Sequence, residues 1–152
     1  MKFVQMDAVS ISTHEKELKN LLYESYLVNF KLSADTIHLI VRDKIKELKK
    51  HVSNKNAYLF GKLTNEKLIA FVWFFEYEYL YEKRMHINQI IVDKEHRGKK
   101  ISNELLQKVE EFAKKQDVQV IDLYVSTSNQ TAMSLYKNKG FKTSREYLTK
   151  EL

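Results

Sequence analysis

Two stretches in the first third of the chain carry apolar residues at every third or fourth position, which is the spacing of one helical face. The first covers residues 13–30, and the second ends near Lys50. Ser33 precedes the second stretch, and serine is a favoured N-cap because its hydroxyl accepts a free backbone N–H. We predict a helix in each stretch, with a short strand over residues 2–7 ahead of them.

The next part of the chain has the composition of β-strands. Val, Phe, Trp and Tyr are dense over residues 57–62 and 68–81, and the short segment 63–67 between them is typical of a hairpin connection. In the second stretch, aromatic residues alternate with positions that include Glu76 and Glu78. Since alternate side chains of a strand point to opposite faces, we expect one aromatic face and one acidic face.

Residues 85–125 have the order strand, helix, strand. The strands are expected over residues 85–92 and 118–125, and apolar residues at helical spacing predict a helix from Ile101 to about Lys115. Such a unit places its two strands side by side and parallel, joined by a right-handed crossover.

The remaining residues predict one more helix and one more strand. The helix is expected over residues 129–138, with Gly140 ending it in the left-handed conformation that glycine adopts readily. The last strand is expected over residues 141–150. The whole pattern predicts an α/β (α+β) fold: a mixed sheet with antiparallel N-terminal strands, a parallel β-α-β unit and helices on both faces.

The composition is that of an ordinary globular domain without crosslinks. The chain has 152 residues and no Cys or Pro, and no low-complexity linker divides it, so we expect one domain over residues 1–152. The lack of Cys excludes disulfides and is compatible with a reducing cytoplasm. The first residues lack the apolar core of a signal peptide, and the apolar run 69–75 is far shorter than the roughly 20 residues of a membrane span. We therefore expect a cytoplasmic protein that does not enter a membrane.

Basic residues give the chain a net charge of +6, which favours an anionic partner such as nucleic acid, anionic lipid or a phosphorylated cofactor. Arg97, Lys99 and Lys100 stand just ahead of the helix that begins at Ile101. A helix N-terminus has free backbone N–H groups and a positive dipole end, so three cations there favour a bound phosphate. A solvated basic turn is the alternative interpretation.

The same turn resembles the acetyl-coenzyme A site of the Gcn5-related N-acetyltransferase (GNAT) family, which has Gln/Arg-x-x-Gly-x-Gly/Ala after a strand. Arg97 matches the first position, Lys100 and Ser102 replace the glycines, and Gly98 falls on a variable position. Lysine is acceptable at the first glycine position if the backbone there is right-handed, whereas a left-handed backbone costs about 1–2 kcal/mol. The resemblance implies that the coenzyme binds at Arg97, Gly98, Lys99, Lys100, Ile101 and Ser102.

A second stretch is similar to the family motif Asn-x-x-Ala-x-x-x-Tyr-x-x-x-Gly-Phe. It matches at five spaced positions, which are Asn129, Ala132, Tyr136, Gly140 and Phe141. The resemblance implies that Asn129 helps to hold the coenzyme arm, that the arm runs along the backbone of Ile90, Ile91 and Val92, and that Tyr136 gives a proton to the departing thiolate. The residues by themselves also fit simpler roles, because Asn129 is a favoured N-cap and Tyr136 shares a helical face with apolar residues.

Acetyl transfer to an amine also needs a base, since a lysine-like amine has a pKa of about 10.4. Family members often place a Glu on the fourth strand, where this chain has Asn88 and Gln89. Glu76, Glu78, His86 and a water relay are the remaining candidates, and spacing selects none of them. An acidic strand face is otherwise solvated surface, and a lone histidine is usually structural.

The residues and the resemblance together predict an enzyme that moves an acetyl group from acetyl-CoA to a primary amine by direct attack in a ternary complex. No metal is expected, because the stretch 14–18 begins like a His-Glu-x-x-His zinc motif but ends in Leu. The acceptor is a small molecule or a protein amine, and a homodimer is compatible with this interpretation. The alternatives are a non-catalytic acyl-CoA-binding or regulatory module of the same fold and, less favoured, a basic nucleic-acid-binding protein.

Overall fold

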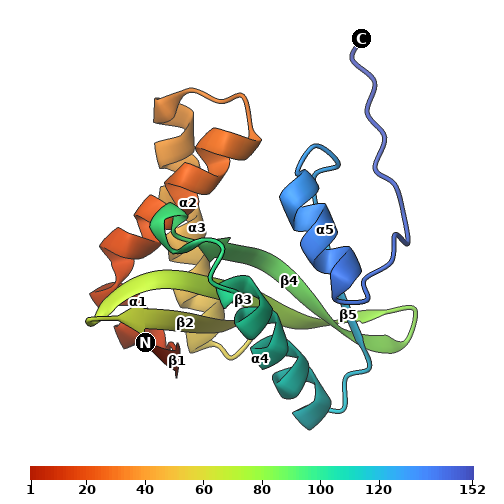
Figure 1. The fold of residues 1–152 in the computed structure, drawn as a ribbon, viewed down its shortest axis with the longest axis horizontal. Helices are drawn as coiled ribbons and strands as arrows, with labels where there is room; N and C mark the ends of the chain where they lie inside the picture. The colour runs from red at the N-terminus through yellow and green to blue at the C-terminus, as the bar shows by residue number, and fades with distance from the viewer.

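The computed structural model describes residues 1–152 as a five-stranded sheet with helices packed on both of its faces (Figure 1). The strands lie in chain order, and every neighbouring pair is antiparallel except the last, which is parallel. They are β1 (Lys2–Gln5), β2 (Tyr58–Thr64), β3 (Lys67–Tyr79), β4 (Glu82–Val92) and β5 (Val120–Leu123). The helices are α1 (Ala8–Thr13), α2 (Glu15–Asn29), α3 (Ala34–Ser53), α4 (Ile101–Lys115) and α5 (Gln130–Asn138).

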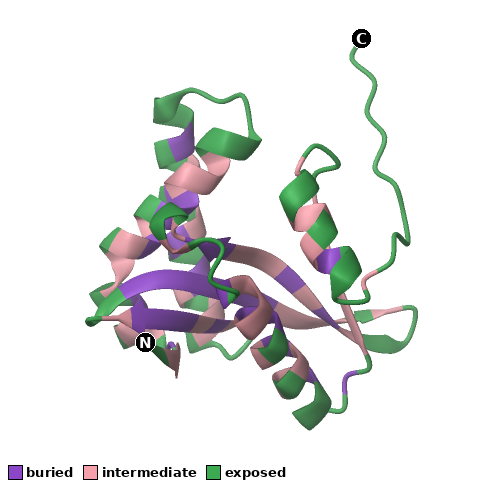
Figure 2. Ribbon diagram, in the orientation of Figure 1, coloured by how far each residue is buried: buried purple, intermediate pink, exposed green.

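Two separate hydrophobic cores hold the helices against the sheet. On one face, residues of α1, α2 and α3 pack with Phe71 and Trp73 of β3. On the other face, α4 and α5 pack with Val72 and Phe74 of the same strand. β3 is therefore buried on both sides over most of its length, as Figure 2 shows in purple. The predicted mixed sheet, with helices on both faces and a parallel β-α-β unit, is confirmed.

The N-terminal helices differ from the expectation in their boundaries. The predicted helix over 13–30 is α2, and a separate short helix, α1, precedes it. Asp7 caps α1 by accepting the Ser10 N–H at 2.8 Å. α1 buries only Ile11, so it has no apolar periodicity from which the sequence could predict it. Ser33 caps α3 as predicted, accepting the Thr36 N–H at 3.2 Å.

The strands β4 and β5 pair over only four residues each. Arg84 to Ile87 lie opposite Val120 to Leu123, and β4 then continues to Val92 with no partner on that side. A register irregularity in the β3/β4 pair leaves Asn88 without a partner at the point where β5 ends. Such bulges bend a strand and increase its twist. The sheet therefore opens between β4 and β5 beyond Ile87, and we call this opening the β4/β5 gap.

The expected last strand over residues 141–150 does not form. Phe141 packs on the α5 side of the sheet, but residues 142–152 are exposed and belong to no helix or strand, and Figure 1 shows them leading away from the sheet. Residues 142–152 have only three large apolar side chains, Tyr147, Leu148 and Leu152, and the first two would point to opposite faces of a strand, so the segment has little apolar surface to bury on either face. Burial would then not offset the entropy lost on ordering it. β5 is likewise shorter than the expected 118–125. No helix in the structure has the length and apolar character needed to cross a membrane.

Candidate active site

The turn between β4 and α4 has the backbone of an anion-binding loop. A single 3-10 turn (Lys94–His96) follows β4, and Gly98 then adopts a left-handed backbone with φ of +77°. The backbone N–H groups of residues 98–103 donate to no acceptor within the protein, because α4 leaves its first N–H groups free and no side chain caps it. Consecutive free N–H groups at the positive end of a helix favour a bound phosphate.

The side chains of this turn divide into two groups. Arg97, Lys99 and Lys100 are exposed to solvent, and Arg97 Nε also donates to the Val92 carbonyl oxygen at 3.2 Å. Ile101 is buried in the core between α4 and the sheet, so only its backbone N–H can meet a ligand. The structure thus places the predicted residues 97–102 together around one helix N-terminus, with the cationic side chains pointing outward.

Lys100 has a left-handed backbone, which is the conformation that costs a lysine free energy at this position. Its φ and ψ are 60° and 14°. A residue with a Cβ costs about 1–2 kcal/mol in this conformation. The first glycine position of the family pattern is therefore occupied here by a lysine with a left-handed backbone, the costly one of the two conformations considered. Strain of this kind persists where the surrounding structure fixes the backbone.

The end of β4 presents free backbone groups to the β4/β5 gap. The Asp93 N–H donates to the Ile69 carbonyl oxygen at 2.8 Å, so Asp93 faces β3 with its backbone groups. In an antiparallel pair this orientation alternates along the strand. Ile91 therefore also bonds toward β3, while Ile90 and Val92 direct their N–H and C=O groups into the gap, where the Val92 carbonyl oxygen already accepts the Arg97 Nε–H.

The helix α5 brings the second motif to the same face as α4. Asn129 caps α5 by accepting the Ala132 N–H at 3.1 Å, and Gly140 ends the helix region with φ of +88°, as the sequence predicts. Tyr136 is 8% exposed, lies with its ring centre 5.6 Å from that of Phe141, and makes no side-chain hydrogen bond. Burial raises the pKa of the Tyr136 phenol to about 12, so the hydroxyl stays protonated at neutral pH.

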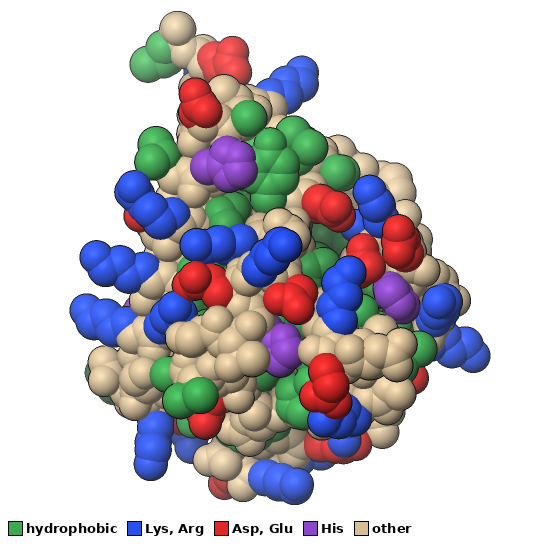
Figure 3. All heavy atoms as spheres, turned by 90° about the vertical axis from the view of Figure 1, so that its left-hand side faces the viewer, with side chains coloured by type: hydrophobic (Ala, Val, Ile, Leu, Met, Phe, Trp, Pro, Cys, Tyr) green, Lys and Arg blue, Asp and Glu red, His purple; other side chains and the backbone are tan.

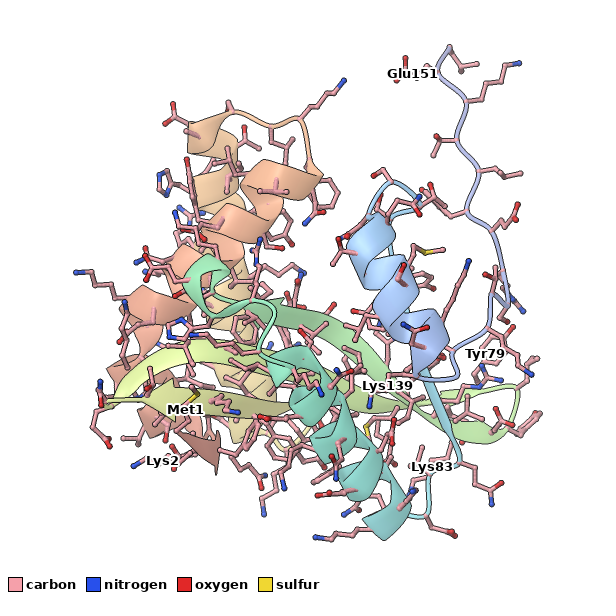
Figure 4. All side chains as sticks on the ribbon, viewed as in Figure 1. Met1, Lys2, Tyr79, Lys83, Lys139 and Glu151 are labelled. Atoms are coloured by element: carbon pink, nitrogen blue, oxygen red, sulfur yellow. The ribbon has the colours of Figure 1, made fainter.

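The predicted acidic face of β3 lies on the α4 side of the sheet. Glu76 lies opposite buried Met85 in the register, which places Glu76 and Glu78 on the same side as α4. Lys83 Nζ is 3.3 Å from Glu76 and donates to the Gln116 carbonyl oxygen at the C-terminal end of α4. Figure 4 labels Lys83 near the end of the β3/β4 hairpin. These carboxylates are therefore next to the end of α4 opposite to the basic turn.

His86 lies on the other face of the sheet, in a polar cluster that the sequence did not reveal. Its Nδ1 is 2.7 Å from Asp122 Oδ1, and Tyr77 donates its hydroxyl hydrogen to Asp122 Oδ2. Arg84 Nη1 is 3.6 Å from the same oxygen. Desolvation first, and then the hydrogen bond to Asp122, raise the pKa of Tyr77 to about 12. Spacing could not predict this cluster, because it depends on the register of the parallel β4/β5 pair.

No group of three or more His, Cys, Asp or Glu side chains that could hold a metal ion occurs in the structure. The site therefore consists of backbone N–H groups, basic side chains, one buried phenol and two sets of carboxylates on opposite faces of the sheet.

Comparison with known proteins gives consistent matches. A model of the acetyltransferase (GNAT) family matches residues 16–141. Over 62 residues, 40% of this chain and 27% of the relative, the chain is 39% identical to an uncharacterized N-acetyltransferase of Methanocaldococcus jannaschii. Over 63 residues, 41% of this chain and 28% of the relative, it is 40% identical to human N-acetyltransferase 8B. The matched region thus spans less than a third of the length of either relative.

Among solved structures, a putative acetyl transferase from Pyrococcus furiosus has a similar fold. It superimposes with a TM-score of 0.76 and 25% sequence identity, covering 99% of this chain and 100% of the other.

Proposed function

The chain belongs to the acetyltransferase (GNAT) family, and we propose that it transfers the acetyl group of acetyl-CoA to a primary amine. The observation that carries this proposal is the run of unbonded N–H groups over residues 98–103, beside the open edge of β4. A donor with a pyrophosphate and a long arm needs both features. The turn supplies donors for the phosphates, and the β4/β5 gap supplies backbone groups for the arm.

The donor's contacts follow from this placement. The pyrophosphate accepts hydrogen bonds from the backbone of residues 98–102, with Arg97, Lys99 and Lys100 adding charge-assisted contacts. Ser102 is small and half-buried, so the backbone stays accessible there. The arm runs along Ile90, Ile91 and Val92, and Asn129 has a side-chain amide nitrogen free to donate to it, because its oxygen is used in capping α5.

The transfer itself depends chiefly on positioning and on electrostatics. Holding the amine and the thioester in attack geometry removes much of the entropic barrier. A backbone N–H of Ile90 or Val92, directed into the gap, stabilises the oxygen that becomes negative as nitrogen attacks. Tyr136 then donates to the sulfur as the carbon–sulfur bond breaks. With its pKa at about 12, the phenol acts best as a hydrogen-bond donor to the developing thiolate.

Glu76 and Glu78 have a place in this proposal as carboxylates that attract a cationic acceptor, or as the base. Glu76 already has Lys83 as a partner, whereas Glu78 is exposed on the same face. Their contribution is separable from donor binding, because they lie near the far end of α4.

The experiment that tests the donor site is thermal denaturation with acetyl-CoA. A ligand at 100 times its Kd adds about 2.7 kcal/mol to stability. At roughly 2–4 °C per kcal/mol for this chain length, Tm should rise by about 5–10 °C. Arg97→Glu with Lys99→Glu should remove most of the rise. Lys46→Glu with Lys50→Glu makes the same change in net charge on exposed positions of α3 and should leave the rise intact.

Release of free thiol from acetyl-CoA, with a panel of polyamines, amino acids, aminoglycosides and peptides, then distinguishes catalysis from binding alone. A Tm rise without thiol release for any amine would favour the non-catalytic acyl-CoA-binding module. A nucleic-acid-binding protein would instead show salt-dependent affinity for DNA or RNA and no Tm rise with acetyl-CoA. On the face drawn in Figure 3, Lys and Arg side chains are interspersed with Asp and Glu, which does not favour a nucleic-acid surface there.

A further inference from the structure

His86 occupies the point of the sheet where β4 and β5 separate. It lies opposite Asp122 in the register of the parallel pair, and the next pair, Ile87 with Leu123, is the last one before the gap opens. From this position and its bond to Asp122, we infer that His86 is the general base of the acetyl transfer and that Asp122 is its positioning residue. The inference rests on the proposed function and names the residue that takes the acceptor's proton.

The hydrogen bonds around His86 set its tautomer. Asp122 Oδ1 can only accept when the carboxylate is ionised, so Nδ1 at 2.7 Å carries the hydrogen. The other ring nitrogen, Nε2, then has a free lone pair, and it makes no hydrogen bond within the protein. A carboxylate that fixes the tautomer also stabilises the imidazolium formed when Nε2 takes a proton.

Asp122 is held in turn by groups from two other strands. Tyr77 of β3 donates to Oδ2, and Arg84 of β4 lies 3.6 Å from that oxygen. Both carboxylate oxygens are therefore occupied, one by His86 and one by Tyr77 and Arg84. These partners fix the carboxylate in the position from which it accepts the Nδ1 hydrogen of His86.

The other groups around His86 are aromatic. Phe75 lies with its ring centre 5.2 Å from that of the imidazole, Tyr77 at 6.1 Å and Tyr124 at 5.3 Å. Tyr23 and Tyr26 of α2 pack against the core on this face. The His86 side chain is only 13% exposed, whereas the neighbouring Tyr124 is 89% exposed. No carboxylate other than Asp122 is bonded to the ring.

The proposed base and the proposed acid lie on opposite faces of the sheet. Phe75, the register partner of His86, packs with the α1, α2 and α3 core, whereas Tyr136 belongs to the core of α4 and α5. An amine that entered the gap from the His86 face would have the proposed base on its own side and the proposed acid for the leaving group on the other. Deprotonation of the nucleophile and protonation of the leaving group can then occur at separate places.

The protons balance as follows. The ammonium form of the acceptor loses one proton to water, and the neutral amine nitrogen bonds to the carbonyl carbon of the thioester. His86 Nε2 takes a second proton from that nitrogen. The carbon–sulfur bond breaks, the sulfur receives a proton from Tyr136, and the proton on His86 restores the phenol through solvent. The sum is an amide, free coenzyme A and one released proton.

The test compares His86→Gln with wild-type protein, using acetyl-CoA and the best amine of the panel. Glutamine keeps the size and polarity of the side chain but cannot act as a base. We expect kcat to fall by about 10²–10⁴-fold with the Kd of acetyl-CoA unchanged. The part of the fall in rate at acidic pH that comes from a protonated imidazole should disappear in the variant, which leaves only the dependence set by the acceptor ammonium. His51→Gln, which changes a partly exposed histidine of α3, should keep both the rate and the pH profile.

Asp122→Asn tests the positioning role. It should lower kcat, and the double variant with His86→Gln should be no slower than His86→Gln alone, because Asp122 acts through His86. NMR of the imidazole nitrogens gives a readout independent of the acceptor. The wild-type ring should carry its hydrogen on Nδ1, and Asp122→Asn should change that tautomer population.

Three results would overturn the inference. In the first, the wild-type protein is active and His86→Gln has a near-normal kcat and pH profile. The proposed function would then stand, and the cluster around His86 would be purely structural, with its effect confined to Tm. In the second, the part of the fall in rate at acidic pH that is assigned to the base disappears in Glu76→Gln with Glu78→Gln but not in His86→Gln, which would assign the base to β3. Wild-type protein that binds acetyl-CoA and acetylates no amine would overturn the proposed function, and the base with it.

Discussion

His86 and Asp122 face each other across the parallel β4/β5 pair, with Nδ1 of one 2.7 Å from Oδ1 of the other. The contact joins two residues that are 36 positions apart in the chain. It also lies within one residue of the point where the two strands separate. The separation of β4 and β5 that opens the gap thus places a carboxylate-bound histidine at the end of that gap.

Lys100 provides a prediction about stability. Replacing it with glycine removes the left-handed strain of about 1–2 kcal/mol, partly offset by about 0.4–1 kcal/mol of added entropy in the unfolded chain. Lys100→Gly should therefore raise the free energy of unfolding by up to about 1.6 kcal/mol, measured by urea denaturation. Lys99→Gly is the matched control, because Lys99 is not left-handed and should gain nothing. Equal or lower stability of Lys100→Gly would show that the strain is relieved in solution.

Tyr136 provides the clearest distinction between enzyme and binding module. Tyr136→Phe removes the hydroxyl and keeps the buried ring, so packing against Phe141 should survive. If the phenol donates to the departing sulfur, kcat should fall by about 10²–10⁴-fold with the Kd of acetyl-CoA nearly unchanged. A kcat within a few-fold of wild type, with any loss appearing in Tm, would make Tyr136 a core residue only.

The two carboxylates of β3 give a prediction about the acceptor. Glu76→Gln with Glu78→Gln removes two negative charges from the α4 side of the hairpin and also leaves Lys83 without its partner. If these charges attract a cationic amine, KM for the acceptor should rise while the Kd of acetyl-CoA stays the same. The effect should weaken with added salt, since Glu78 is exposed and screened. Unchanged acceptor kinetics would identify this face as ordinary solvated surface.

Alkaline pH should destabilise the protein through Tyr136. The pKa of this phenol is about 12 in the folded state, above its ordinary value of 10, so folding favours the protonated form. The resulting stability is complete below pH 10 and is lost as pH rises toward 12. A shift of this size corresponds to about 3 kcal/mol. Denaturation at several pH values should show this loss in wild-type protein relative to Tyr136→Phe, while Tyr81→Phe, at a position 98% exposed, should behave as wild type.

Much of the fold could be predicted from local patterns, because helices and strands are selected by side chains close together in sequence. Ser33 is the N-cap of α3, α4 covers Ile101–Lys115 as expected, and Gly140 has the predicted left-handed backbone. The parallel unit could also be predicted from the order strand, helix, strand, because a helix between two neighbouring strands is the usual crossover that makes them parallel. The errors fell where the local signal is weak: α1 buries only one residue, and residues 142–152 have only three large apolar side chains.

The candidate site also has parts that the sequence predicts and parts that only the tertiary structure decides. The two motifs located the basic turn and α5 by sequence alone, because each is a continuous segment whose residues stay together in any fold that keeps the helix. The left-handed backbone of Lys100, the free edge of β4 beyond Ile87 and the contact of His86 with Asp122 were decided only by the tertiary structure. The physical reason is that strand register and the point at which β4 and β5 separate depend on how the two cores pack against the sheet, and spacing within one segment carries no information about either.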